Sequence, residues 1–514
     1  MASQDFEKQV NDSTDPIAQA PSLHNDEDMH KLPDGMHADI GLELYREALL
    51  MDPAEREAIA RRVKMKLDCI LMPMMCFIYF LGYLDKQTLN YANAYGLKAD
   101  LGLVGRDYSW VASITNIGYL VCAYPSMLLL QKLPIGKFVA GNLMLWGTIL
   151  LLTTTAHNFA GIMALRFVLG GAEACIGPAW MLLTSMFWTR EEQPLRMSWW
   201  LGCNGLSSMV GAGLSWGLGH THSSLAPWQL VFLVVGVISF SFGIVALWFL
   251  PSSPNDCVFL TSTERIVAVW RVSHNRTGVK NTTFLWYQAL EAAADIKMYC
   301  FAALALGIGI LNGAVGNFFS AIIAGFGFGS LKVLLYQLPI GAFQFAFTIA
   351  GGMLTAFVPN LLCITIIVAF LPGLAGMIGI ATISLEHGLS LLACVWIQGI
   401  WGISNILSWT LVAVNVAGHT KRTTANAVWF MFYAAGNIIG PFLFIPSEAP
   451  RYFTAIKALA GIFGSCIFFV ACLWVIMFTE NRRRGEFVIP DEIGNEDGFT
   501  DRTDRENKAF RYKL

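Results

Sequence analysis

Four charged side chains are predicted to lie deep inside the apolar segments of this 514-residue chain, namely Asp85, Lys86, Arg166 and Glu173, while Asp68 falls at the edge of one. A charge at the centre of a bilayer costs about 2.5 to 3.5 kcal/mol or more, so one that remains there usually lines a cavity and has a function. Burial favours the neutral form of an acid and a neighbouring cation favours its charged form. That competition would let one carboxyl group load and release a proton.

Arg166 and Glu173 are the first candidates for such chemistry. They are seven residues apart, which places them about two turns apart on one helix face, with Gly170 and Gly177 on the same stripe. Small residues there leave room beside the charges. The alternative is an interhelical clamp in which a neighbour satisfies each charge and neither touches a substrate.

A second polar stripe is predicted on the first apolar segment. Lys86, Asn90 and Asn93 stand at i, i+4 and i+7. Lys86 could contact a substrate carboxylate with Asn90 as a hydrogen-bond partner, or it could extend to the membrane interface. Asp85 is about 100° round the helix from Lys86. We therefore expect Asp85 to pair with another helix and hold the bundle together.

The second half of the chain offers fewer polar candidates. Asn312 and Asn437 are the residues that we expect to face a substrate cavity, although buried asparagines often only hydrogen-bond across helices. Lys421 and Arg422 precede an apolar segment. At such a helix end, basic residues more often set the orientation of the helix in the membrane or form ion pairs at a gate than contact a substrate. They are assigned a structural or gating role.

The composition indicates a bilayer as the solvent of most of the chain. Hydrophobic residues make up 55% and charged residues 14%, whereas charged residues form about 25% of an ordinary soluble protein. The formal net charge of −2 argues against a nucleic-acid partner. Of the eleven cysteines, only Cys257 lies outside an apolar segment, so we expect neither a disulfide framework nor a metal site.

Enzyme motifs are not supported by their context. The GxSxG pattern from Gly213 to Gly217 lies in an apolar segment, away from the strand-to-helix turn that a hydrolase needs. No phosphate-binding GxxxxGK[ST] loop is present. We therefore expect no enzymatic activity and no cofactor. An ion gradient, such as a proton gradient, would supply the energy.

A transmembrane helix needs about 20 apolar residues. The sequence predicts twelve such spans: 67–94, 109–130, 138–156, 159–188, 197–219, 229–250, 298–328, 333–358, 361–385, 389–416, 425–447 and 458–479.

Basic residues flank alternate connections between these spans, which predicts that both termini are cytoplasmic. The resulting division is a cytoplasmic tail (1–66), a six-helix half (67–250), a cytoplasmic central loop (251–297), a second six-helix half (298–479) and a cytoplasmic C-terminal tail (480–514). The expected fold is an all-α membrane protein of twelve helices in two halves, with the substrate site near the midplane between them, as in the major facilitator fold.

Several motifs resemble the allantoate permease family of fungal anion:cation symporters within the major facilitator superfamily. The resemblance runs from Lys66 to Arg484, and the segments that carry it are 84–92, 166–174 with Pro178, 250–254, 259–265, 415–422, 436–441 and 449–452.

Two sequence patterns that other facilitators carry are reduced or missing in this chain. The motif between the second and third spans keeps only Gln131-Lys132 and Gly136-Lys137, without its Asp, which puts a gating salt bridge there in doubt. The fifth span has no Pro between Gly205 and Gly217, which disfavours drug efflux by that mechanism.

The resemblance implies a function for the charged residues. Glu173 would be the proton-coupling acid, and Arg166 would bind or pair with an anion. We expect a monomeric proton symporter of the plasma membrane that imports a small organic anion across the lipid bilayer. Allantoate, ureidosuccinate, nicotinate and small peptides are the substrate candidates. An exporter of a secondary metabolite and a nutrient sensor that does not transport remain the alternatives.

Overall fold

In the computed structural model, the regular elements of the described chain are all helices. The described residues are 47–189, 192–221, 223–273, 285–358, 360–485, 503–507 and 510–514, and no strand occurs among them. Most of the predicted N-terminal tail (1–46), part of the predicted central loop (274–284) and much of the predicted C-terminal tail (486–502) therefore lie outside the described residues.

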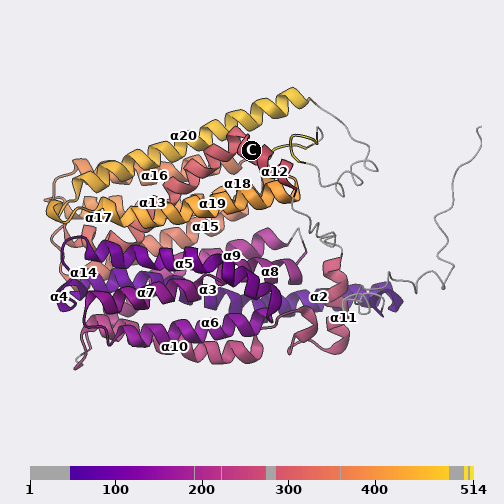
Figure 1. The fold of residues 1–514 in the computed structure, drawn as a ribbon, viewed down its shortest axis with the longest axis horizontal. Coiled ribbons are helices and arrows are strands. Elements are labelled where there is room, and N and C mark those ends of the chain that lie inside the picture. The colour runs from indigo at the N-terminus through magenta and orange to yellow at the C-terminus, as the bar shows by residue number, and fades with distance from the viewer. Residues whose placement is uncertain are drawn as a thin grey trace, which may run out of the picture.

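The long helices form two groups that lie one above the other in Figure 1. The first group comprises α3 (Met72–Ala94), α5 (Asp107–Lys132), α6 (Ile135–Thr153), α7 (Phe159–Glu173), α8 (Ile176–Phe187), α9 (Gln193–Leu218) and α10 (Pro227–Phe249). The second group comprises α13 (Ile296–Ala324), α14 (Ser330–Leu335), α15 (Leu338–Phe357), α16 (Leu362–Thr382), α17 (Gly388–Trp396), α18 (Gly402–Asn415), α19 (His419–Ile439) and α20 (Phe453–Arg484).

Shorter elements mark the two ends of this bundle. At one end lie α2 (Pro53–Lys66), α11 (Ser262–Ser273), α12 (Trp286–Ala293) and the last described residues of the chain (Figure 1). We call it the basic end. The other end carries α4 (Leu97–Asp100) and α14, and we call it the opposite end.

Within the described residues, ten helices or continuous helical stretches are long and apolar enough to cross a membrane. They coincide with ten of the predicted spans. The helices α9 and α19 lie at the other two predicted spans, 197–219 and 425–447, but are not among the ten. Both pack against the other group, α9 along α15 and α19 against α5. A helix that packs one face against the other group can carry more polar residues on that face than a helix that mainly faces lipid.

The structure interrupts two predicted spans. The span 159–188 is divided at Ala174 and Cys175, directly after Glu173, into α7 and α8. The span 389–416 contains a 3-10 segment, Ile397–Trp401, between α17 and α18. Broken helices at membrane depth are tolerated where they are enclosed by protein or line a cavity. The first interruption therefore places Glu173 at the end of a helix, inside the bundle.

The two groups approach most closely where glycines face each other on α9 and α15. A Cβ atom added to Gly341 on α15 would lie 2.6 Å from the carbonyl oxygen of Gly205 and 2.5 Å from the backbone nitrogen of Met209, both on α9. The two backbones are thus in direct contact, as small residues allow in membrane helices.

This contact predicts the effect of a single methyl group. Gly341→Ala should lower the melting temperature of the purified protein, because the added carbon forces α15 away from α9. Gly461→Ala on α20 is the matched control, since a Cβ there meets nothing within 4 Å, and alanine is favoured over glycine in a helix by about 1 kcal/mol. Equal melting temperatures for the two variants would contradict the close contact.

Candidate functional site

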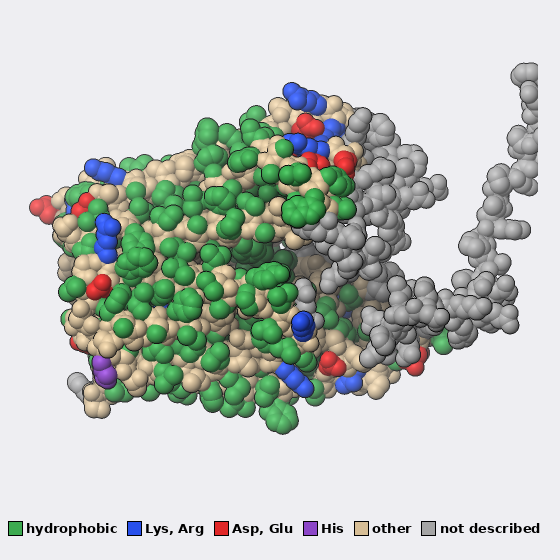
Figure 2. Space-filling model, viewed as in Figure 1, with side chains coloured by type: hydrophobic (Ala, Val, Ile, Leu, Met, Phe, Trp, Pro, Cys, Tyr) green, Lys and Arg blue, Asp and Glu red, His purple; other side chains and the backbone are tan. Residues whose placement is uncertain are grey.

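An ion pair lies in the middle of the first group. The Nζ atom of Lys86 on α3 is 3.2 Å from Oε2 of Glu173, the last residue of α7. Glu173 is 4% exposed, but 47% of the Lys86 side chain is accessible although it stands well inside the 23-residue α3. Lys86 therefore borders an open space inside the protein. Figure 2 shows a hollow between the two groups towards the basic end.

The structure brings Arg166 and Asp85 into the same region without giving either an ion pair. Arg166 is 2% exposed and its guanidinium carbon lies 5.2 Å from the ring centroid of Phe232 on α10. Within the described chain, its Nε and Nη2 atoms have no hydrogen-bond partner, and no carboxylate lies within 4.0 Å of it. Asp85 is fully buried, with both carboxyl oxygens unpartnered, and interacts electrostatically with Glu173 and Arg166.

The ion pair among these charges joins two helices. Glu173 is paired with Lys86, on another helix, and not with Arg166, on its own helix. Two acids and two cations are thus gathered, with one ion pair among them. Unpartnered buried polar atoms are rare in proteins and expensive to maintain, so this cluster is the candidate functional site.

Tyrosines that sequence reasoning missed surround Lys86. Its Nζ atom lies 5.6 Å from the ring centroid of Tyr119 on α5, and Tyr79 on α3 and Tyr433 on α19 are further electrostatic neighbours. Tyr83 on α3 has Gln344 of α15 as a polar neighbour, so the second group also contributes to the surroundings of this site. We call Tyr79, Tyr83, Tyr119 and Tyr433 the tyrosine wall. The signal was present in the sequence, because positions 79, 83, 86 and 90 share one helical face.

Asn312 and Asn437, expected at the cavity, contact each other. The Nδ2 group of Asn312 on α13 donates to Oδ1 of Asn437 on α19 at 2.7 Å, and Nδ2 of Asn437 donates to the carbonyl of Tyr433 at 2.9 Å. The pair therefore supports the backbone at Tyr433, which faces Lys86.

Asn90 lies in a different contact, nearer the opposite end. Its Nδ2 group donates to Oε1 of Gln337 at 2.8 Å, and its Oδ1 accepts from the backbone N–H of Ser320 at 3.1 Å. Both partners belong to the second group of helices, so Asn90 joins the two groups. Lys86 and Asn90 lie on one face of α3 but have different partners: Lys86 pairs with Glu173, and Asn90 binds the second group.

Three further hydrogen bonds cross between the groups near the opposite end. The hydroxyls of Tyr108, Ser109 and Ser113 on α5 donate to second-group carbonyls: Asn317 at 3.0 Å, Pro441 at 3.0 Å and Ile438 at 2.8 Å. We call these bonds, together with those of Asn90, the seal.

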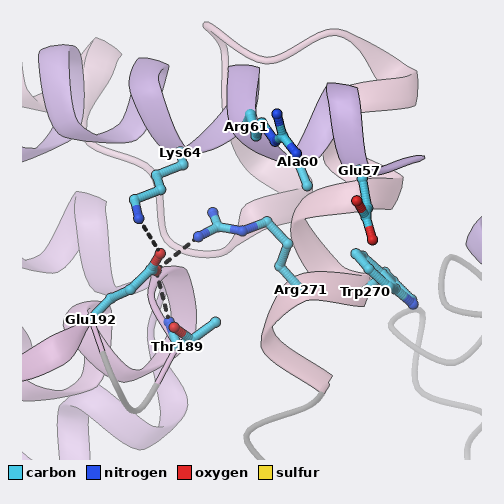
Figure 3. Close-up of a pocket in the computed structure, with 8 residues that line it drawn as sticks. All are labelled: Glu57, Ala60, Arg61, Lys64, Thr189, Glu192, Trp270 and Arg271. Carbon is cyan, nitrogen blue, oxygen red and sulfur yellow. Dashed lines mark hydrogen bonds and ion pairs between the residues drawn. The ribbon is translucent and has the colours of Figure 1, made fainter. Parts of the chain in front are cut away.

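The charges of the basic end are neutralised separately in each group. Glu192 lines a pocket of about 340 Å³ between α2 and α11 (Figure 3), where Lys64 and Arg271 each lie 2.8 Å from its carboxylate. Lys421, expected to be structural or gating, is buried and pairs with Glu291, Asp295 and Asp504 at 2.7 to 3.1 Å. Arg422 lies beside it in the first turn of α19. Across the described ranges, no ion pair at this end joins the two groups.

Comparisons with known proteins agree with this architecture. Residues 75–441 match the model of the Major Facilitator Superfamily. An uncharacterized transporter of Schizosaccharomyces pombe is 37% identical, over 88% of this chain and 87% of its own. The allantoate permease of Saccharomyces cerevisiae is 30% identical, over 93% and 90% of the two chains. The thiamine pathway transporter THI73 of the same yeast is also 30% identical, over 88% and 86%. The two groups of membrane-length helices agree with the family match and with these relatives. The chain belongs to the major facilitator superfamily and, within it, to the allantoate permease family of fungal transporters.

Proposed function

We propose that this transporter imports a small organic anion together with protons, by alternating access across the plasma membrane. The observation that carries the proposal is the Lys86–Glu173 ion pair beside the open space, with Arg166 and Asp85 buried next to it and unpartnered in the described structure. A charged centre in an otherwise apolar bundle suits a charged substrate and a coupling ion.

Glu173 and a substrate carboxylate compete for Lys86, so proton binding to Glu173 favours anion binding. A proton on Glu173 removes the negative partner of Lys86, and the ammonium group is then free to bind a substrate carboxylate. Arg166 supplies N–H donors in a planar fork that suits two-point recognition of a carboxylate. Release of the proton would restore the Lys86–Glu173 pair and expel the anion. Each state thus satisfies Lys86 with one negative group.

The direction of transport follows from the charge that moves. The membrane potential contributes about 2.3 kcal/mol per elementary charge per 100 mV. Uptake is driven inward if more protons than anion charges enter in each cycle. The proton gradient is then the energy source, and no cofactor is needed.

The substrate class is a small carboxylate, of which allantoate, ureidosuccinate, nicotinate and small peptides are candidates. One relative is named an allantoate permease and another a thiamine pathway transporter. The first of these names is consistent with a site whose charges recognise a carboxylate. The tyrosine wall would then select the remainder of the molecule.

The full transport unit in this proposal is a monomer of twelve spans. The helices α9 and α19 are the two spans added to the ten apolar ones, and they line the contact between the groups. The basic end faces the cytoplasm, in keeping with the excess of Lys and Arg in cytoplasmic connections. The seal then closes the extracellular side, and substrate would enter after the seal has opened.

Neutralising the proposed coupling acid should separate binding from accumulation. Glu173→Gln mimics the protonated state, so we expect substrate exchange to persist while concentrative uptake is lost. The measurement is uptake of labelled candidate carboxylates into vesicles with and without an imposed pH gradient. Glu386→Gln, an exposed acid at the opposite end, is the control. Accumulation by Glu173→Gln at the unmodified level would rule out its coupling role.

The geometry of Arg166 predicts how it would respond to a change that keeps its charge. Arg166→Lys retains one positive charge but loses the planar fork, so apparent affinity for the anion should fall about tenfold or more while surface expression is preserved. Half-saturation for uptake and the fraction at the cell surface are measured together. Arg106→Lys at the opposite end is the control. An unchanged half-saturation would make Arg166 a structural residue.

The Lys86–Glu173 pair also predicts a non-additive effect on stability. Removing one partner of a buried pair is destabilising by about 3 to 5 kcal/mol, because the other charge is left uncompensated. The value for this half-exposed lysine should be smaller. Lys86→Met should lower the melting temperature, and adding Glu173→Gln should recover most of the loss. Additive losses in the double variant would contradict a direct pair.

A further inference from the structure

The last described residues of the chain are bound to the basic end of the second group. We call residues 503–507 and 510–514 the strap. Its Asp504 is fully buried between two lysines: Oδ2 accepts a hydrogen bond from Nζ of Lys297 on α13 at 2.5 Å, and Oδ1 forms an ion pair with Nζ of Lys421 on α19 at 2.7 Å. The hydroxyl of Tyr512, also in the strap, donates to Oδ2 of Asp504 at 2.7 Å and accepts from Lys297 at 2.7 Å. One carboxylate thus ties two helices to the strap.

Two asparagines hold the backbone of the strap. Asn481 on α20 accepts from the N–H of Tyr512 at 2.9 Å and donates to its carbonyl at 2.8 Å. Asn415, the last residue of α18, makes the same two bonds to Lys513, at 2.7 and 2.9 Å. The N–H of Leu362, where α16 begins, donates to the carbonyl of Leu514 at 2.7 Å. The strap therefore joins the basic ends of five helices: α13, α16, α18, α19 and α20.

The charge on Asp504 persists at any cytoplasmic pH. Although burial alone would raise it, the neighbouring Lys297 and Lys421 lower the pKa of Asp504 to about 2. The two lysines are themselves buried; Lys297 has Asp295 as a further acidic partner, and Lys421 has Asp295 and Glu291. Removing the charge of Asp504 would weaken the pairing of both lysines at once.

The strap acts on the first turn of α19 in two ways. Lys421 in that turn is bound by Asp504, and Thr503 packs against Gly418, the residue that precedes the helix; a Cβ on Gly418 would lie 3.1 Å from Cγ2 of Thr503. Gln288 on α12 accepts from the N–H groups of Thr420 and Lys421. The start of α19 is thus fixed by residues from its own group.

The other end of α19 belongs to the seal. The carbonyl of Ile438 accepts from Ser113, and the carbonyl of Pro441, just beyond the helix, accepts from Ser109. A helix of 21 residues is about 31 Å long. One rigid element therefore has the strap at one end and bonds to the first group at the other.

We propose that the strap holds α19 in the position that closes the seal, so that release of the strap shifts the protein towards the conformation with the seal open. Opening the seal by a tilt of α19 would displace its first turn from the other four helix ends that the strap binds. The contacts of the strap then differ between the two conformations and favour the one with the seal closed. The strap and the seal are then two distinct sites coupled through a shared element. This coupling goes beyond the proposed anion uptake and does not depend on which substrate is carried.

Hydrogen exchange measured on the full chain tests the proposal. In Asp504→Asn, amide exchange should become about tenfold faster both in the first turn of α19, beside the strap, and at the seal, in the last turn of α19 and the first turns of α5. Tyr512→Phe, which removes only one hydroxyl, should give a smaller change at the same two places. Asp256→Asn, an exposed acid at the basic end, is the matched control and should change neither.

The outcomes separate coupling from local loosening. Faster exchange confined to the first turn of α19 would overturn the proposal, as would unchanged exchange at both places. If Asp504→Asn does not fold, Tyr512→Phe decides on the same criterion. Exchange at the seal is read without substrate, so a failure of anion uptake would refute the proposed function and leave the strap unaffected.

Discussion

The cost of placing charge in an apolar interior governs the whole arrangement of this protein. The Lys86–Glu173 pair reduces that cost for two of the four central charges, and the tyrosine hydroxyls nearby are polar neighbours of Lys86. Lys86 and Glu173 stand on different helices, so the first group must hold the end of α7 within reach of α3 for the pair to exist. Nearly half of the Lys86 side chain stays accessible, so the site also keeps space beside the pair. The helix end and the space beside it thus belong to one electrostatic arrangement.

The two ends of the bundle are held by different kinds of bond: neutral hydrogen bonds between the groups at the opposite end, and ion pairs within each group at the basic end. At the opposite end, hydroxyl and amide groups bond across the groups to backbone carbonyls and neighbouring side chains. At the basic end, lysines, arginines and acids are numerous, but each described ion pair stays within one group. Neutral hydrogen bonds contribute about 0.5 to 1.5 kcal/mol each, so a contact made of several can be broken one bond at a time. Buried ion pairs are less easily exchanged, which suits them to holding a group together.

Much of the fold could be predicted from the sequence, because apolar segments of membrane length are a strong signal. Ten of the predicted spans coincide with helical stretches that are long and apolar enough to cross a membrane. The α9 and α19 segments were predicted as spans too, but helices packed against the other group carry polar residues that weaken the signal. The break after Glu173 had no sequence marker that we recognised. Pro178 could have indicated it, because proline has no N–H to bond to the carbonyl of Ala174, four residues earlier.

The four central charges could also be found from their rarity in apolar segments, but their partners could not. Helical spacing relates residues on one helix, so it placed Arg166 and Glu173 on one helix face, about two turns apart. Distances between helices decide that Lys86 is the partner of Glu173. The same limit explains the tyrosines: Tyr79 and Tyr83 share a face with Lys86, whereas Tyr119 and Tyr433 come from other helices. Asn90 illustrates the remaining difficulty, since one stripe along α3 runs from the charged site to the seal.

The hydrogen bonds from Asn415 and Asn481 to the strap affect how freely the sequence of the strap can change. Both side chains bind the main chain of Lys513 and Tyr512, which every residue type except proline presents equally. The identity of residue 513 is therefore almost free to drift, while Asp504 and Tyr512 are constrained by the lysines that they contact. The segment can acquire a new surface, and with it new binding partners, without losing its place on the protein.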